Sequence, residues 1–120
     1  MQDFKKLKVW QKAHQLVLSV YSASKKFPRV ELFALTDQFR RAAFSIAANT
    51  AEGSGRRSRK EFTYFLGIAL GSVSEVEYSL ILAKDLNYLA VADFQSMQRQ
   101  ADEVRRMLIS LIKKIEGTHT

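Results

Sequence analysis

The amino-acid sequence predicts an all-α protein, an antiparallel up-down-up-down four-helix bundle. Three observations support this prediction. The 120 residues include one proline and five glycines, so few positions interrupt a helix. Apolar residues recur at spacings of three and four, which is typical of one buried helix face. No stretch has the alternating pattern of a strand bounded by hairpin turns.

The composition indicates a single domain spanning residues 1–120. A chain of this length can enclose a core, and 47% hydrophobic with 26% charged residues is an ordinary globular balance. The absence of cysteine excludes disulfides, thiolate metal sites and cysteine nucleophiles. The charged N-terminus is unlike a signal peptide, and no uncharged apolar run approaches the ~20 residues that span a bilayer. We therefore expect a cytoplasmic protein that does not enter a membrane.

The first helix is expected over about residues 5–26. It ends before Pro28, because the residue that precedes a proline is disfavoured in the α region. The connector runs from Pro28 to Leu35, and we expect Phe33 and Leu35 to tuck under the bundle. The expected apolar positions of the helix are Leu7, Trp10, Ala13, Val17, Val20, Tyr21 and Ser24.

The second helix is expected over about residues 36–52. Thr36 is a suitable N-cap, and Asp37 suits the positive end of the helix dipole. Gly53 and Gly55 then supply the permissive backbone that a helix stop requires. Alanine-rich flanks on both sides of a narrow polar stripe predict burial by more than one neighbour. The stripe is either a wet seam or an internal hydrogen-bond network.

The third helix is expected over about residues 58–87, because Ser58 and Glu61 form a capping box. One face is an ordinary core stripe that includes Phe62, Phe65, Leu66, Ala69, Val73, Val76, Leu80 and Ala83. The roughly opposite face is also apolar, with Tyr64, Ile68, Gly71, Tyr78, Leu82 and Leu86. Gly67 and Gly71 lower helix propensity, so we expect a neighbouring helix to approach closely there.

The fourth helix is expected over about residues 91–116, after a tight turn at residues 87–90. It has a single apolar face, formed by Phe94, Met97, Ala101, Val104, Leu108, Leu111, Ile112 and Ile115. The second and third helices therefore carry more apolar surface than one bundle can bury, which predicts a homo-oligomer. The expected interface or polar-stripe residues are Gln38, Arg40, Arg41, Ser45, Asn49, Glu52, Tyr64, Gly71 and Tyr78.

We predict no catalytic residue, metal site or cofactor. His14 lacks the companion ligands that a metal site needs, so it is expected to be a half-buried structural residue. Ser45 and Asn49 have no base placed beside them by sequence. The Glu-x-x-His spacing of carboxylate metal bundles is missing. We expect instead that Glu52, Glu75 or Glu77 pairs with Arg40 or Arg41.

A net charge of +7 and a pI near 9.9 indicate an affinity for polyanions such as nucleic acid. In an antiparallel bundle, the turn after Gly55 should meet both chain ends, while residues 25–29 lie at the far end. The alternative, that these cations are simply solvated at helix ends, stays open. The candidate nucleic-acid-binding residues are Lys5, Lys6, Lys8, Arg56, Arg57, Arg59, Lys60, Lys113 and Lys114.

Several segments together resemble the bacterial four-helix bundle proteins of the 23S rRNA intervening-sequence family. They read Leu7-x-Val-Trp-x-x-Ala13, Phe27-Pro28-x-x-Glu31-x-Phe33-x-Leu35, Gln38-x-Arg-Arg-Ala-Ala-x-Ser-Ile-x-x-Asn49, Ala51-Glu52-Gly53, Ser58-x-x-Glu61-Phe62-x-x-Phe65-Leu66-x-Ile-Ala69-x-Gly71-Ser72-x-x-Glu75-x-Glu77 and Asn87-Tyr88-Leu89. Ala34 and Thr50 replace a glycine and an isoleucine that are usual in the family, and neither change should disturb the fold.

The resemblance implies a homopentamer whose genes often lie within insertions in 23S rRNA, and hence a link to RNA. Related Avd accessory proteins of diversity-generating retroelements are similar basic pentamers that bind nucleic acid and a reverse transcriptase. No enzyme activity is established for the family. We therefore expect a non-catalytic oligomeric bundle that binds RNA or DNA through a basic surface. The alternative is a protein-interaction scaffold or an accessory factor for a partner such as a reverse transcriptase.

Overall fold

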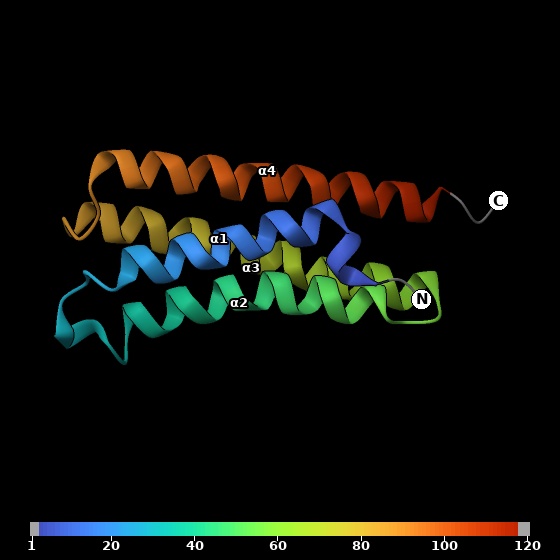
Figure 1. Ribbon diagram of the computed structural model, residues 1–120, viewed down its shortest axis with the longest axis horizontal. Coiled ribbons are helices and arrows are strands. Elements are labelled where there is room, and N and C mark those ends of the chain that lie inside the picture. Colours follow the sequence, from blue (N-terminus) through green and yellow to red (C-terminus); the bar gives the residue numbers. More distant parts are fainter. Residues whose placement is uncertain (1–2, 118–120) are drawn as a thin grey trace.

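Four long helices lie side by side in the computed structural model, which describes residues 3–117 (Figure 1). They are α1 (Lys8–Ser24), α2 (Leu35–Ser54), α3 (Arg59–Asp85) and α4 (Val91–Glu116). Two short 3-10 turns, η1 (Phe4–Lys6) and η2 (Arg29–Glu31), precede α1 and α2. Every regular element within residues 3–117 is helical, which confirms the all-α prediction.

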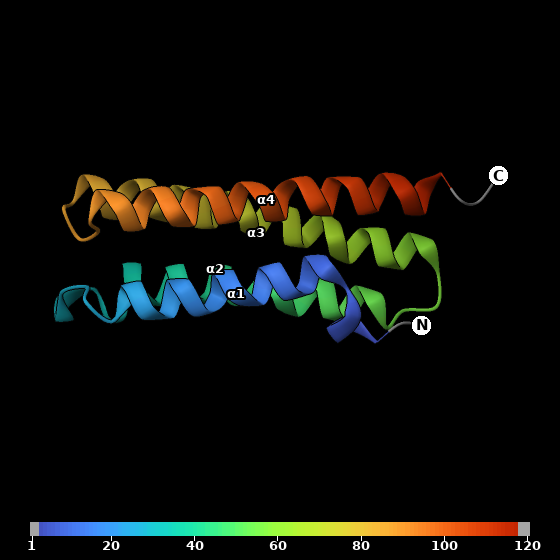
Figure 2. The same ribbon diagram turned by 45° about the horizontal axis from the view of Figure 1, so that its top comes forward.

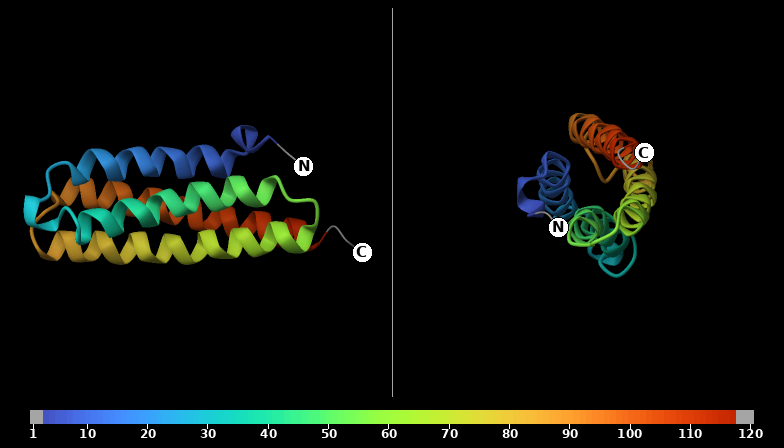
Figure 3. Two further views of the ribbon diagram at one scale, coloured as in Figure 1. Left: turned by 90° about the horizontal axis from the view of Figure 1, so that it is seen from below. Right: turned by 90° about the vertical axis from the view of Figure 1, so that its right-hand side faces the viewer.

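The helices form an elongated body of about 50 × 23 × 20 Å. α1 packs against α2 and α4, and α3 also packs against both α2 and α4. The end-on view shows these four helices arranged around a common axis (Figure 3). The α2–α3 turn lies at the same end as η1 and the last turns of α4, as two side views agree (Figures 1 and 2).

Two helices begin differently from the sequence prediction. α1 starts at Lys8, because the Asp3 carboxylate accepts a hydrogen bond from the Lys5 backbone N–H at 3.0 Å and starts the separate turn η1. α2 starts at Leu35, whose backbone N–H donates to the Glu31 carboxylate at 3.3 Å. Thr36 therefore lies buried inside the helix, and its prediction as N-cap is wrong.

The core runs the length of the bundle between all four helices. α3 and α4 contribute the apolar faces that their spacing predicts, including the fully buried Leu66, Val73 and Leu108. The buried face of α1 is rotated from the predicted face. Leu16 is buried, although it was not among the predicted apolar positions, and Tyr21 is exposed, although it was. Leu35 is buried as expected, whereas Phe33 is 91% exposed, so the prediction that it tucks under the bundle is wrong.

Gly53 allows α2 and α3 to approach closely near their connecting turn. A Cβ atom at this position would lie 3.0 Å from the Phe65 Cβ and 3.1 Å from the Phe62 carbonyl oxygen. α2 accordingly continues through Gly53 to Ser54 instead of stopping at Glu52. α3 then begins with the predicted capping box, in which Ser58 Oγ accepts from the Glu61 backbone N–H at 3.0 Å.

A hydrogen bond ties the two connections at the opposite end together. The Tyr88 hydroxyl donates to the Glu31 carboxylate at 2.9 Å, and the Tyr88 ring packs 5.6 Å from the Phe27 ring. Asn87 takes a positive φ of 64°, which lets the Tyr88 N–H close α3 on the Ala83 carbonyl at 2.8 Å. The bond to Glu31, with smaller contributions from burial and the carboxylate charge, raises the pKa of Tyr88.

By length and composition alone, α3 is apolar enough to be a candidate membrane span. The core helix of a soluble protein meets the same criterion. Here one face of α3 lies in the bundle core, and its middle carries Glu75 and Glu77.

We expect the substitution Gly53→Ala to destabilise the fold by about 1–3 kcal/mol, because the new methyl group meets fixed atoms of α3. Gly67→Ala is the matched control, since a Cβ at Gly67 has no heavy atom within 4 Å. The control should gain about 0.5–1 kcal/mol through helix propensity. Urea unfolding of both variants measures the difference, and equal effects would contradict the close approach.

Stability should also fall when Tyr88 ionises. Its pKa is higher in the folded chain than the ordinary 10.0, so the bond to Glu31 stabilises fully below pH 10.0 and is lost as the pH rises through the folded-state pKa. The wild type should therefore be more stable than Tyr88→Phe near neutral pH, and this advantage should shrink above pH 10.0. Urea unfolding across this range tests it, with the exposed Tyr21 replaced by Phe as control.

Candidate nucleic-acid interface

The structure places all the candidate nucleic-acid-binding residues at one end of the bundle. η1 and the start of α1, the α2–α3 turn and the last turns of α4 meet there (Figure 1). The basic group at residues 25–29 lies at the opposite end, beside the connection from α1 to α2 (Figure 1). We call the first region the basic end. Its candidate residues are Lys5, Lys6, Lys8, Arg56, Arg57, Arg59, Lys60, Lys113 and Lys114, all of them exposed.

Arg56 differs from the other cations because it is engaged within the chain. Its guanidinium contacts the Glu52 carboxylate at 2.8 Å and the Glu61 carboxylate at 3.9 Å. It also lies 4.8 Å from the centre of the Phe65 ring. Arg56 therefore joins the end of α2 to the first turn of α3, and its single charge balances one of the two carboxylates of this corner.

The cations that follow Arg56 line an open groove of about 490 Å³. Arg57, Arg59 and Lys60 form one side, and Ile115 and Glu116 of α4 form the other. Arg59 and Lys60 occupy the first turn of α3, where backbone N–H groups and the positive end of the helix dipole favour an anion. This groove is therefore suited to a phosphate group.

A second groove, of about 540 Å³, lies between the start of α1 and the end of α4. It brings Lys8 and Lys114 together with Arg106 over a floor that includes Leu7 and Met107. Arg106 also contacts Asp102 at 2.6 Å. Arg106 is not among the candidate residues predicted from the sequence, because only the packing of α1 on α4 brings it beside Lys8.

The basic end also carries a group of stacked aromatic rings. The Trp10 and His14 rings are parallel within 4°, with centroids 5.1 Å apart. The Phe4 ring meets Trp10 edge-on at 4.9 Å. His14 is exposed, so the expectation that it is half-buried is wrong. Sequence reasoning assigned Trp10 to the core, and its i, i+4 spacing to His14 was the available signal for this stack.

The middle of the polar stripe of α2, at Ser45 and Asn49, forms an internal hydrogen-bond network with Ser72 of α3. Ser72 Oγ donates to Ser45 Oγ at 2.7 Å, and Asn49 Nδ2 donates to the Ser45 carbonyl at 2.9 Å and to Ser45 Oγ at 3.0 Å. Each of these groups is thus satisfied by the fold. Gln38 and Arg41 lie farther along the stripe and line a groove of about 410 Å³ with Tyr78 of α3.

The predicted arginine partners of the glutamates are wrong. Glu52 pairs with Arg56, and Glu77 pairs with Arg105 of α4. Arg40 instead faces α1, where its Nε donates to Ser24 Oγ at 2.8 Å and its guanidinium lies 4.8 Å from the Tyr21 ring centre. The i, i+4 spacing of Glu52 and Arg56 was a signal for the first pair, whereas the partners of Glu77 and Arg40 lie on other helices and could not be found from spacing.

An apolar stripe on α3 faces away from the other three helices. Tyr64 and Tyr78 are each 64% exposed, and Ile68 is 39% exposed. Gly67 and Gly71 lie between them, with no heavy atom within 4 Å of a Cβ built at either position. Within residues 3–117, then, no neighbouring helix approaches these glycines, contrary to prediction. The stripe confirms that the chain has more apolar surface than its own bundle buries.

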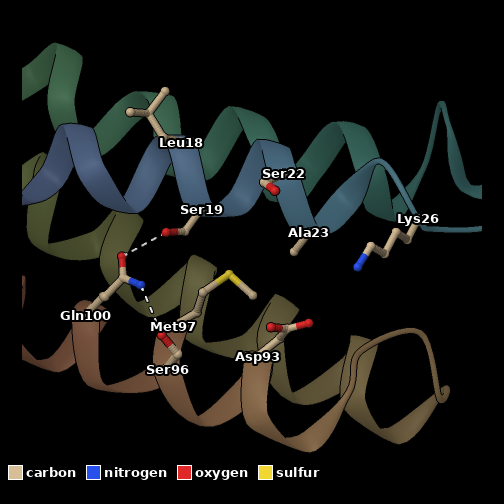
Figure 4. A pocket seen from close by; sticks show the side chains of 9 residues that line it. All are labelled: Leu18, Ser19, Ser22, Ala23, Lys26, Asp93, Ser96, Met97 and Gln100. Atoms are coloured by element: carbon tan, nitrogen blue, oxygen red, sulfur yellow. Dashed lines mark hydrogen bonds between the residues drawn. The ribbon is translucent and has the colours of Figure 1, made fainter.

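A further groove, of about 350 Å³, lies between α1 and α4 (Figure 4). Ser19 Oγ donates to Gln100 Oε1 at 3.2 Å, and Gln100 Nε2 donates to Ser96 Oγ at 3.4 Å (Figure 4). An amide cannot act as a general base, so this arrangement does not activate Ser19. Across residues 3–117, no three His, Asp or Glu side chains gather in a way that would hold a metal ion.

Comparisons with known proteins agree with this fold. A family model described as 23S rRNA-intervening sequence protein matches residues 5–110. The chain is similar to the crystal structure of a protein of unknown function from the S23 ribosomal protein family of Bacteroides thetaiotaomicron, with a TM-score of 0.82 and 29% identity over 88% of this chain and 98% of that one. No curated protein matches the sequence.

Proposed function

We propose that this chain, which belongs to the 23S rRNA-intervening sequence protein family, is a non-catalytic bundle that binds RNA or DNA through its basic end. The observation that carries the proposal is the meeting of three separate basic segments at one end of the molecule (Figure 1). Acidic side chains at the α2–α3 corner do not cancel this charge, because Arg56 balances one of Glu52 and Glu61 and the three cations Arg57, Arg59 and Lys60 outnumber the other. We place the protein in the cytoplasm.

Phosphate groups are the natural ligands of such a surface. Exposed lysines and arginines neutralise phosphates and release counterions, which gives affinity without reading the sequence of the nucleic acid. Arg57, Arg59 and Lys60 would hold one stretch of backbone at the start of α3. Lys8 and Lys114 would hold another stretch at the α1–α4 groove. A single strand or a nucleic-acid duplex could therefore run across the basic end.

We further propose that the antiparallel up-down-up-down bundle assembles as a homopentamer through α2 and α3. The exposed stripe of Tyr64, Gly71 and Tyr78 supports an interface on α3. The number of copies rests on the family resemblance. A closed ring would repeat the basic end around its axis, and several weak phosphate contacts would then act together.

A second candidate function is that of a scaffold or accessory factor for a partner protein. The observation that favours it is an apolar projection on the connector between α1 and α2. Val30 is 82% exposed and Phe33 is 91% exposed. The connector that carries them lies at the end of the molecule opposite the basic end (Figure 1). A protein partner such as a reverse transcriptase could therefore dock there while nucleic acid occupies the basic end. Pull-down with and without nuclease separates a direct protein partner from one held through RNA.

Reversing two charges at the basic end should weaken nucleic-acid binding. We expect Arg59→Glu with Lys60→Glu to lower the affinity for an arbitrary RNA by about tenfold or more at low salt, and to reduce the slope of log affinity against log salt by about 1–2. Acidic residues suit the first turn of α3, so the fold should survive. Lys25→Glu with Lys26→Glu is the control with equal charge at the far end. Fluorescence anisotropy across a salt series measures both, and equal losses would overturn the proposal.

The substitution Gly71→Glu should break the oligomer without unfolding the chain. Open space surrounds this position in the single bundle, so only a second copy would meet the new carboxylate. Light scattering should give several times 13.7 kDa for the wild type and a smaller mass for the variant. The control Gln98→Glu adds the same charge at an exposed position of α4, and this variant should keep the wild-type mass. A monomeric wild type would contradict the assembly.

A further inference from the structure

We propose that Phe4, Trp10 and His14 form a stacking platform for an unpaired base of a single-stranded nucleic acid. The inference rests on the proposed function, because the platform lies at the same basic end. It adds a second mode of contact, since the cations bind phosphates whereas the rings would bind bases. The ligand class is single-stranded RNA or DNA, whose bases are free to stack on protein side chains.

Two of the three rings are stacked, and the third, Phe4, meets Trp10 edge-on. Trp10 and His14 are separated by one helical turn on α1, which places their rings on the same face. Their 4° interplanar angle and 5.1 Å centroid distance describe an offset stack. Trp10 is partly buried against the core, whereas His14 is exposed. The exposed imidazole thus ends a stack whose inner ring, that of Trp10, packs against the core.

Local hydrogen bonds hold the platform in place. The Asp3 carboxylate caps η1 through the Lys5 N–H at 3.0 Å, and Gln11 Nε2 donates to the Lys5 carbonyl at 2.9 Å. These bonds fix η1, and with it Phe4, against the first turn of α1. A base that stacks here would therefore meet rings that are already ordered, which lowers the entropic cost of binding.

The charges around the platform favour nucleic acid over an apolar protein segment. Lys5, Lys6 and Lys8 are exposed on the same short segment that carries the rings. The nearest carboxylate in sequence, Asp3, is engaged as the cap of η1. Aromatic faces beside lysines form the combination with which proteins bind single strands, because bases stack while the backbone phosphates are neutralised. Core packing alone does not account for the position of His14, whose ring lies outside the core.

Trp10 is the only tryptophan in the chain, so its fluorescence reports directly on the platform. The experiment compares an oligothymidine with an abasic oligonucleotide of the same length and phosphate number. We expect the oligothymidine to quench Trp10 and to bind about tenfold more tightly than the abasic strand. The abasic strand should bind through phosphates alone and leave the emission nearly unchanged.

Two variants identify the platform as the cause. His14→Ala should remove most of the advantage of the oligothymidine and leave the affinity for the abasic strand unchanged. Gln15→Ala, at the next and also exposed position of α1, should behave as the wild type. Equal binding of both strands by the wild type, or an undiminished advantage in His14→Ala, would overturn the platform while the phosphate-binding proposal stands. Failure of both strands to bind at low salt would overturn both proposals.

Discussion

The close approach of α2 and α3 at Gly53 is the constraint on which the basic end depends. Without a Cβ at this position, the backbone of α2 can lie directly against Phe62 and Phe65. The Phe65 ring is thereby placed where Arg56 covers it and reaches two carboxylates. The cations that follow in the turn project from a fixed corner, so they lose less conformational freedom on binding than cations on a loose loop would.

The sequence predicts the helices of this protein better than it predicts the side-chain contacts between them. Four helices, the capping box at Ser58 and the apolar face of α4 follow from local spacing, because each depends on residues within one or two turns. The predicted N-cap at Thr36 is wrong, because the start of α2 depends on a residue outside the helix. The N–H group of Leu35 is satisfied by Glu31 from the connector, and this contact requires the chain to fold back on itself.

The candidate site shows the same division. Charge and an antiparallel bundle are sufficient to predict that the turn after Gly55 would meet both chain ends. They could not predict that Arg56 makes contacts within the chain while Arg57 lines a groove. This difference depends on where Glu52, Glu61 and Phe65 lie in space. Long side chains such as Arg40 and Arg105 choose partners across helices, beyond the reach of spacing rules.

The side of α3 and the basic end differ in their surface chemistry. On α3, the side surface is apolar and contains two glycines with open space before them, which suits contact with another helix. At the basic end, the surface is cationic and built from helix starts and stops, which suits phosphate groups. The rings of Trp10 and His14 lie on the first turns of α1, which within residues 3–117 packs against α2 and α4 and not against α3. An assembly through α2 and α3 would leave that segment free, so oligomerisation and nucleic-acid contact need not compete for the same residues.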